Sequence, residues 1–267
     1  MTTVATIIVA DPSGPGLATI LWTVVGGYLA AGGAGAVNHY LERERDAHMD
    51  RTCGRPLVSG RIDPRNGLWF GVFLVVAATI ELGVTVNDLA AVLALAGFLG
   101  YIVVYTVWLK PRTPQNIVIG GAAGAVPPLV GWAAATGGLS WDALYPFAIV
   151  FLWTPPHFWA LALLIKDDYA RAQIPMLPVV RGDGATRLQI LIYTGALVAF
   201  SILPYITGLF DGFYLWAAVL LGGGFLALVV RLWLRPSRRA AVAVHLASLA
   251  YLALLFCAMA VDRAVAR

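Results

Sequence analysis

Long apolar stretches separated by short polar segments recur along the whole chain. A helix needs roughly 20 apolar residues to cross a bilayer core of about 30 Å. Stretches of this kind lie at 17–37, 68–86, 89–108, 117–136, 144–164, 188–208, 213–231 and 240–261. Each is expected to be helical, because lipid cannot satisfy the hydrogen bonds of an open backbone. The pattern predicts an all-α, polytopic bundle of membrane-spanning helices.

A ninth apolar stretch, "TTVATIIVA" at 2–10, is too short to cross a membrane unaided. It also lacks the basic lead-in of a signal peptide. We expect it to form the tail end of a helix.

Composition supports one membrane domain spanning residues 1–267. Hydrophobic residues make up 60% of the chain and charged residues 12%, whereas soluble domains carry about 45–50% and about 25%. The only cysteines, Cys53 and Cys257, are too few for a disulfide framework. The net charge of +4 does not indicate a nucleic-acid partner, because the basic residues are distributed as in a membrane protein.

Basic side chains gather in alternate loops. The segments 38–67, 109–116, 165–187 and 231–239 hold Arg43, Arg45, Arg51, Arg55, Arg61, Arg65, Lys110, Arg112, Lys166, Arg171, Arg181, Arg187, Arg231, Arg235, Arg238 and Arg239. The intervening loops 11–16, 87–88, 137–143 and 209–212 contain none. Because cytoplasmic loops of membrane proteins carry an excess of Lys and Arg, the four basic loops are predicted to face the cytoplasm.

Acidic residues share these loops, and orientation alone does not require them. Asn38, Glu42, Asp46 and Asp50 recur every four residues. If the span at 17–37 continues as a helix past the membrane surface, they share one face. Such oxygens repel one another unless a cation neutralises them, and Mg²⁺ favours one or two carboxylates together with substrate phosphates.

Cationic side chains near this stripe offer suitable donors for a diphosphate. They are Arg51, Arg55, Lys110 and Arg112. Metal and cations beside an apolar interior suit a phosphorylated lipid whose tail lies in the bilayer. The alternative is a solvated helix end stabilised by ion pairs between neighbouring turns, which would give the same stripe. A second acidic pair, Asp167–Asp168, follows the span at 144–164 with the same orientation, which favours two halves facing a shared cavity.

Three stretches make the chain similar to a known family. They are "NHYLERERDAHMDRTCGRPLVSGRI" (38–62), "YTVWLKPRTPQNIVIGGAAGAVPPLVGW" (105–132) and "WTPPHFWALALLIKDDYARAQIPMLPVV" (153–180). The chain resembles the UbiA-type membrane prenyltransferases, and within them the protohaem IX farnesyltransferase (haem O synthase) branch. The strings "MDRTCGRPL" and "PPHFWALA" are specific to that branch.

The resemblance implies a fold of nine helices, with the first helix truncated in this chain. It implies transfer of a farnesyl group from farnesyl diphosphate to a vinyl group of protohaem, with water added, diphosphate released and Mg²⁺ as cofactor. It places the protein in the cell (inner) membrane, with its catalytic loops facing the cytoplasm. Expected partners are the two substrates, the lipid bilayer and a membrane protein that modifies haem or assembles an oxidase, but no nucleic acid.

The resemblance also assigns residues to roles. The first metal motif matches Asn38, Glu42 and Asp46, and the second matches Asp168 with its neighbour Asp167; Asn38, Glu42, Asp46 and Asp168 are the catalytic candidates. Diphosphate contacts fall on Arg51, Arg55, Lys110, Arg112, Asn116 and Lys166. The chain departs from the family in having Glu42 where Asp is usual and Ala172 where a second spaced acid stands.

Two histidines inside spans are haem-side candidates. His157 follows Pro155–Pro156, and His245 lies in the last span. With the resemblance, His157 is expected to ligate iron, orient a propionate or shuttle a proton. A purely structural role is the alternative, and for His245 it is the favoured one.

Three other functions are compatible with parts of the pattern. A prenyltransferase acting on a quinone or chlorin precursor would share the metal stripe but would not need "PPHFW". A transporter would place its charges near the membrane midplane, whereas these acids cluster at one face. A structural membrane subunit would not need two acidic clusters on the same side.

Overall fold

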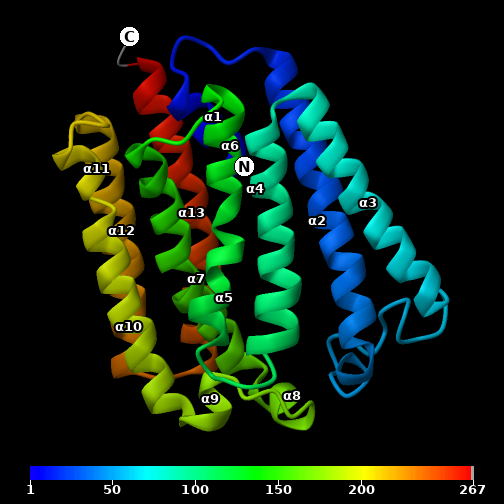
Figure 1. Ribbon diagram of the computed structural model, residues 1–267. Helices are drawn as coiled ribbons and strands as arrows, with labels where there is room; N and C mark the ends of the chain where they lie inside the picture. Colours follow the sequence, from blue (N-terminus) through cyan, green and yellow to red (C-terminus); the bar gives the residue numbers. More distant parts are fainter. Residues whose placement is uncertain (266–267) are drawn as a thin grey trace.

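The protein is a bundle of membrane-length α-helices, seen in a computed structural model that describes residues 1–265 (Figure 1). Within those residues, eight helical stretches are long and apolar enough to cross a membrane. They are α2 (Leu17–Asp46), α3 (Pro64–Thr85), α4 (Asp88–Leu99) continued by the π-helix η1 (Gly100–Leu109), α5 (Asn116–Gly124) with α6 (Val126–Thr136), the 3₁₀ turn η2 (Trp141–Ala143) with α7 (Leu144–Leu164), α10 (Gly182–Phe200) with α11 (Leu203–Ile206), α12 (Gly212–Leu234) and α13 (Arg238–Val265). The remaining helices are α1 (Thr2–Ala10), α8 (Lys166–Arg171) and α9 (Leu177–Val180). Each of the eight predicted spans overlaps one of these stretches, with α2 running nine residues past the predicted end at 37, and the all-α prediction is confirmed.

Polar and proline residues set several helix ends. Asp63 caps α3 by accepting a hydrogen bond from the Arg65 backbone N at 2.8 Å, and Pro64 occupies the first helical position, where the missing N–H costs nothing. Asn87 caps α4 in the same way through the backbone N of Ala90. Its amide nitrogen also donates to the carbonyl of Ala133 at 2.9 Å, which ties α4 to α6.

The short helix α1 packs inside the bundle against α6 and α13. Gly131 permits this approach, because a Cβ there would lie 2.3 Å from the carbonyl oxygen of Thr3. The expected helical tail at 2–10 is therefore present, and it forms part of the wall around the core.

Helices α2 and α3 form the most extensive helix pair. A Cβ on Gly33 would lie 2.7 Å from the carbonyl oxygen of Gly71, and one on Gly71 would lie 2.8 Å from Val37. Small residues at a helix crossing let backbones approach closely in a membrane. This contact fixes the direction in which α2 carries its polar end.

Two ends of the bundle differ in polarity. The loop after α2, α8 and α9 lie at the lower end in Figure 1, and the loop at 11–16 and the C-terminal end of α13 lie at the upper end. At the upper end Asp262, only 3% exposed, accepts hydrogen bonds from the backbone N atoms of Asp211 (2.7 Å) and Tyr214 (2.9 Å). Asp262 thus caps α12 from a neighbouring helix, a role that the sequence did not indicate.

Candidate functional site

The polar stripe of α2 is buried. Asn38, Glu42 and Asp46 are 5%, 4% and 4% exposed, although all three carry polar groups. Helix α2 ends at Asp46, because the chain turns there and the Thr52 hydroxyl donates to the Asp46 carbonyl at 3.0 Å. Asp50 therefore leaves the stripe and is exposed, contrary to the expectation that four positions share one helical face.

All three residues line one cavity of about 270 Å³, which we call the polar cavity. Its walls come from α2, the loop after it, the η1 region, α5, α7 and α8. The lining residues are Asn38, Glu42, Asp46, Met49, Arg51, Arg55, Tyr101, Tyr105, Lys110, Ile117, Gly120, Gly121, Gly124, Val150, Trp153, Thr154, Phe158 and Tyr169. The structure thus brings three of the predicted cations to the predicted oxygen ligands.

Each buried carboxylate has its own cation. Lys110 Nζ lies 2.6 Å from the Glu42 carboxylate, and Arg55 Nη1 lies 2.5 Å from Asp46 Oδ2. Asn38 Nδ2 donates to Glu42 Oε2 at 3.0 Å and to the Thr106 hydroxyl at 3.1 Å. The Lys110 ammonium group lies 2.6 Å from each of the two Glu42 carboxylate oxygens. A buried carboxylate is tolerated when a cation or hydrogen-bond donors satisfy it, and these ion pairs neutralise the stripe.

Aromatic side chains form much of the remaining wall. Tyr101 and Tyr105 stack with their ring centroids 5.8 Å apart, and Lys110 Nζ lies 5.9 Å from the centre of the Tyr105 ring. Tyr169 of α8 closes the polar cavity, and its burial raises the pKa of its phenol. Trp153 and Phe158 contribute from α7. The composition did not indicate these aromatic positions, because aromatic residues occur throughout the spans.

The second acidic cluster lies beside the polar cavity. Asp168 is 9% exposed and accepts a hydrogen bond from Arg171 at 2.5 Å. The same guanidinium group donates to Asp50 at 2.7 Å. Arg171 therefore joins α8 to the loop after α2, and the two acidic clusters meet. Asp167 is exposed to solvent.

Three predicted diphosphate residues lie outside the lining of the polar cavity. Lys166 pairs with Asp183 at 3.1 Å, and both side chains are more than two-fifths exposed. Arg112 is exposed and donates to the carbonyls at the end of η1. Asn116 is fully buried, and its Oδ1 has no hydrogen-bond partner.

The two haem-side candidates lie in contact, where α7 meets α13. The His157 and His245 rings stack at 4.5 Å, and the other face of His157 stacks on Trp153 at 4.2 Å. His157 Nδ1 lies 2.7 Å from the Ser248 hydroxyl. Trp153 lines the polar cavity, so the histidine stack is one side chain behind its wall.

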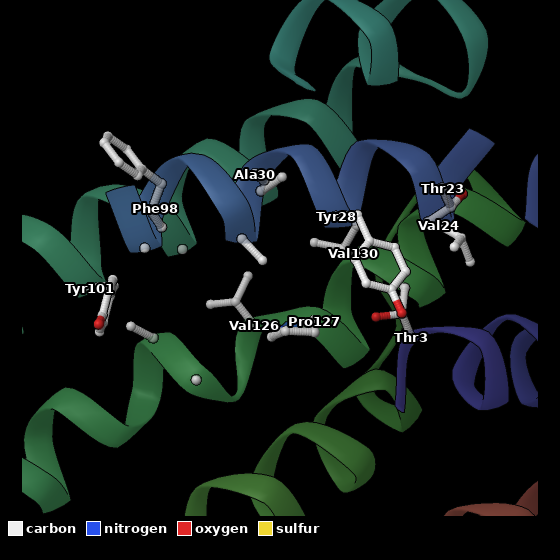
Figure 2. Close-up of a pocket in the computed structure, with 18 of the residues that line it drawn as sticks. Thr3, Thr23, Val24, Tyr28, Ala30, Phe98, Tyr101, Val126, Pro127 and Val130 are labelled. Carbon is white, nitrogen blue, oxygen red and sulfur yellow. The ribbon is translucent and has the colours of Figure 1, made fainter. Parts of the chain in front are cut away.

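A larger apolar cavity of about 770 Å³ adjoins the polar cavity. It lies between α1, α2, α4 and α6, and its lining is mostly Ala, Gly and Val. Tyr101 and Gly124 line both cavities. In Figure 2, Tyr101 lies at one end of the apolar cavity, and Thr3 and Tyr28 lie toward the other. The combined space offers a charged head site and a long apolar extension.

Comparison with known families agrees with this arrangement. The profile of the "UbiA prenyltransferase family" matches residues 1–260. The chain belongs to this family. Its UbiA domain covers nearly the whole sequence, as the single run of membrane helices indicates.

Relatives within the UbiA family are identical to this chain at about half of the aligned positions. A protein named "Protoheme IX farnesyltransferase" from Roseiflexus sp. is 50% identical over 265 residues, which are 99% of this chain and 50% of that protein. One with the same name from Methylococcus capsulatus is 46% identical over 98% of this chain and 88% of its own length. The chain therefore spans about half the length of the Roseiflexus relative and most of the second.

Solved UbiA-type structures share the fold. The structure of a digeranylgeranylglyceryl phosphate synthase has a TM-score of 0.81 at 17% identity and covers 99% of this chain and 92% of its own. A UbiA homologue from Archaeoglobus fulgidus, bound to DMAPP and Mg²⁺, has a TM-score of 0.66 at 12% identity, with 97% of this chain and 94% of its own covered.

The donor set of this UbiA chain fits a magnesium ion shared with a substrate. No group of three His, Cys, Asp or Glu side chains within residues 1–265 forms a closed metal site. Mg²⁺ does not require one, because it is usually bound by one or two carboxylates together with phosphates and water. Asn38, Glu42 and Asp46 offer one amide and two carboxylate groups to one cavity, and such hard oxygen donors suit this ion.

Proposed function

We propose that the protein transfers a farnesyl group from farnesyl diphosphate to a vinyl carbon of protohaem IX, with addition of water and release of diphosphate, giving haem O. One observation carries the proposal. A cavity lined by paired acids and cations shares two wall residues, Tyr101 and Gly124, with a much larger apolar cavity. This arrangement suits a substrate with a diphosphate head and a long isoprenoid tail.

The polar cavity suits ionisation of the allylic diphosphate. The bond between the allylic carbon and the diphosphate oxygen breaks, and both electrons leave with the diphosphate. Arg51, Arg55 and Lys110 line the cavity, and cations in a water-poor site stabilise such developing negative charge strongly. Magnesium held by Asn38, Glu42 and Asp46 would supply further charge neutralisation. We assign Asp168, a predicted metal residue that pairs with Arg171 beside the cavity, to closure of the cavity.

The wall of the cavity suits the carbocation that remains. Tyr101, Tyr105, Trp153 and Phe158 line it, and aromatic faces attract cations. The vinyl π-electrons form the new carbon–carbon bond, and water adds to the cation left on the porphyrin side chain and loses a proton. Protohaem as the acceptor is supported by the names of relatives at about half identity and by the "PPHFWALA" string in α7.

The distribution of basic residues supports a cytoplasmic location for the polar cavity. The basic loops and the polar cavity lie at the same end of the bundle, which we assign to the cytoplasmic face of the cell membrane on the positive-inside rule. Farnesyl diphosphate would then reach its head site from the cytoplasm, with its tail in the membrane. A membrane-bound protein that modifies haem or assembles an oxidase would collect the product.

Product mass after incubation tests the proposal directly. Purified protein in lipid nanodiscs receives farnesyl diphosphate, Mg²⁺ and protohaem, and we expect a haem product heavier by one farnesyl group and one hydroxyl group. Protein with Asp88→Asn, an exposed acid at the start of α4, serves as a control that keeps activity. Prenylation of a quinone precursor in place of protohaem would overturn the assigned acceptor.

A further inference from the structure

Thr106 lies where η1 meets the polar stripe of α2. It is 2% exposed, and its hydroxyl has two partners. The hydroxyl donates to the carbonyl oxygen of Tyr101, five residues earlier, at 3.0 Å, and it receives the Asn38 amide nitrogen at 3.1 Å. The bond to a residue five positions back matches the π-helical turn of η1, and π-helical segments occur often at functional sites.

Proton counting fixes how these groups are oriented. A threonine hydroxyl has one proton, and a carbonyl can only accept, so the proton of Thr106 is used on Tyr101. Toward Asn38 the hydroxyl is then an acceptor. The Glu42 carboxylate, 3.0 Å from the same amide nitrogen, is also only an acceptor when ionised. Both protons of the Asn38 amide are thereby used, and its NH₂ group must point to Thr106 and Glu42.

We propose that Thr106 is a positioning residue that holds the Asn38 amide oxygen toward the polar cavity. Asn38 lines that cavity, and Oδ1 is the one polar atom of its amide that these two bonds leave free. Turned the other way, the amide would present two N–H donors to a bound cation and repel it. The inference rests on the proposed function, since it assigns Oδ1 to the magnesium–diphosphate head of the substrate.

The test compares hydroxyl-deleting and hydroxyl-keeping variants in a binding assay. Purified Thr106→Val and Thr106→Ser proteins are titrated with farnesyl thiolodiphosphate, which does not ionise, over a range of Mg²⁺ concentrations, and separately with protohaem. Because one hydrogen bond is lost, the Mg²⁺ concentration for half-maximal binding should rise roughly five- to tenfold in Thr106→Val. It should stay within about twofold of wild type in Thr106→Ser. Protohaem affinity should not change in either variant.

Thr186→Val is the matched control. Thr186 is also fully buried, and its hydroxyl donates to a carbonyl one turn back, that of Gly182, at 2.8 Å. It lies on α10, away from the polar cavity, so its loss should leave the Mg²⁺ dependence at the wild-type value. If Thr106→Val does not accumulate, Thr106→Ala removes the same hydroxyl without adding a methyl group in its place and must give the same shift.

The outcomes separate this inference from the proposed function. A Thr106→Val protein with wild-type Mg²⁺ dependence overturns the inference, as does an equal loss of affinity for protohaem, which would indicate a merely structural role. Wild-type protein that binds the thiolodiphosphate with Mg²⁺ but makes no farnesyl-haem overturns the proposed acceptor and leaves the inference standing. No Mg²⁺-dependent binding by wild-type protein would overturn both.

Discussion

At the scale of single residues, the polar cavity is a set of matched charges. Lys110 stands 2.6 Å from Glu42, and Arg55 stands 2.5 Å from Asp46. Deleting one partner of a buried pair leaves an uncompensated charge and costs about 3–5 kcal/mol. Substitution of a carboxylate by its amide keeps the shape and tests chemistry with less damage to the fold.

Asp46→Asn is expected to leave an inserted, folded protein that has lost turnover. The amide can still accept from Arg55, but it no longer offers a charged oxygen to a magnesium–diphosphate head. Electrostatic groups of this kind contribute roughly 100-fold or more to rate. Initial rates of farnesyl-haem formation measure the loss, with the thermal midpoint as the check on folding. Normal turnover would refute the role of Asp46 in metal binding.

His157→Ala is expected to weaken protohaem binding roughly tenfold and to leave farnesyl diphosphate binding almost unchanged. The ring is sandwiched between Trp153 and His245 and bonded to Ser248, so its loss loosens the α7 wall behind Trp153. Separate titrations of the two substrates measure the difference. His48→Ala, in the exposed loop after α2, is the control.

The absorption spectrum of the bound haem then separates two roles for His157. Loss of an iron ligand would shift the Soret band, whereas loss of packing would lower affinity with the band in place. Equal weakening of both substrates would contradict any haem-side role.

At the scale of helices, the sequence predicts correctly those features that the hydrophobic effect determines. The eight spans were predictable, since a lipid-exposed helix must be apolar over its membrane-crossing length. The pairing of Lys110 with Glu42 joins residues 68 positions apart, and only the packing of η1 on α2 brings them together. The end of α2 at Asp46, which removes Asp50 from the stripe, depends on one turn capped by Thr52. No helical periodicity reveals such a turn.

Gly33→Ala is expected to destabilise the protein by about 1–3 kcal/mol. The added Cβ would lie 2.7 Å from the Gly71 backbone oxygen, so α2 and α3 would have to separate. Because α2 carries Asn38, Glu42 and Asp46, activity should fall with stability. Thermal unfolding in detergent measures the effect. Gly32→Ala is the control, since its Cβ would lie at an ordinary 3.7 Å from Leu74; equal destabilisation by both would contradict this account.

At the scale of the whole molecule, the bundle places the proposed reaction site and the proposed site for the prenyl tail at different depths in the membrane. The polar cavity lies between the cytoplasm-assigned ends of the helices, and the apolar cavity extends from it toward α1 and the outer half of α2. The charge pattern indicated the first site, because charges are rare in this chain and therefore informative. The second could not be predicted, because its Ala, Gly and Val lining is uncharged and such residues occur in all the spans.

Gly124 lies at the junction of the two cavities, and a Cβ there would meet nothing within 4 Å. A phenyl ring at this position should therefore enter open space and narrow the passage without disturbing helix packing. We expect Gly124→Phe to lower affinity for farnesyl diphosphate at least roughly tenfold, while dimethylallyl diphosphate, whose short tail needs only the polar cavity, binds as before. Competition among farnesyl, geranyl and dimethylallyl diphosphates for the same head site measures the selectivity.

Gly223→Phe provides the matched control for this substitution. Gly223 is exposed on α12, and its Cβ would also meet nothing within 4 Å, so the same change there should alter neither affinity. An unchanged ranking of the three diphosphates in Gly124→Phe would mean that the tail does not pass Gly124. The apolar cavity would then not be the prenyl site. A uniform loss for all three would instead place the effect on the head site, because chain length would no longer matter.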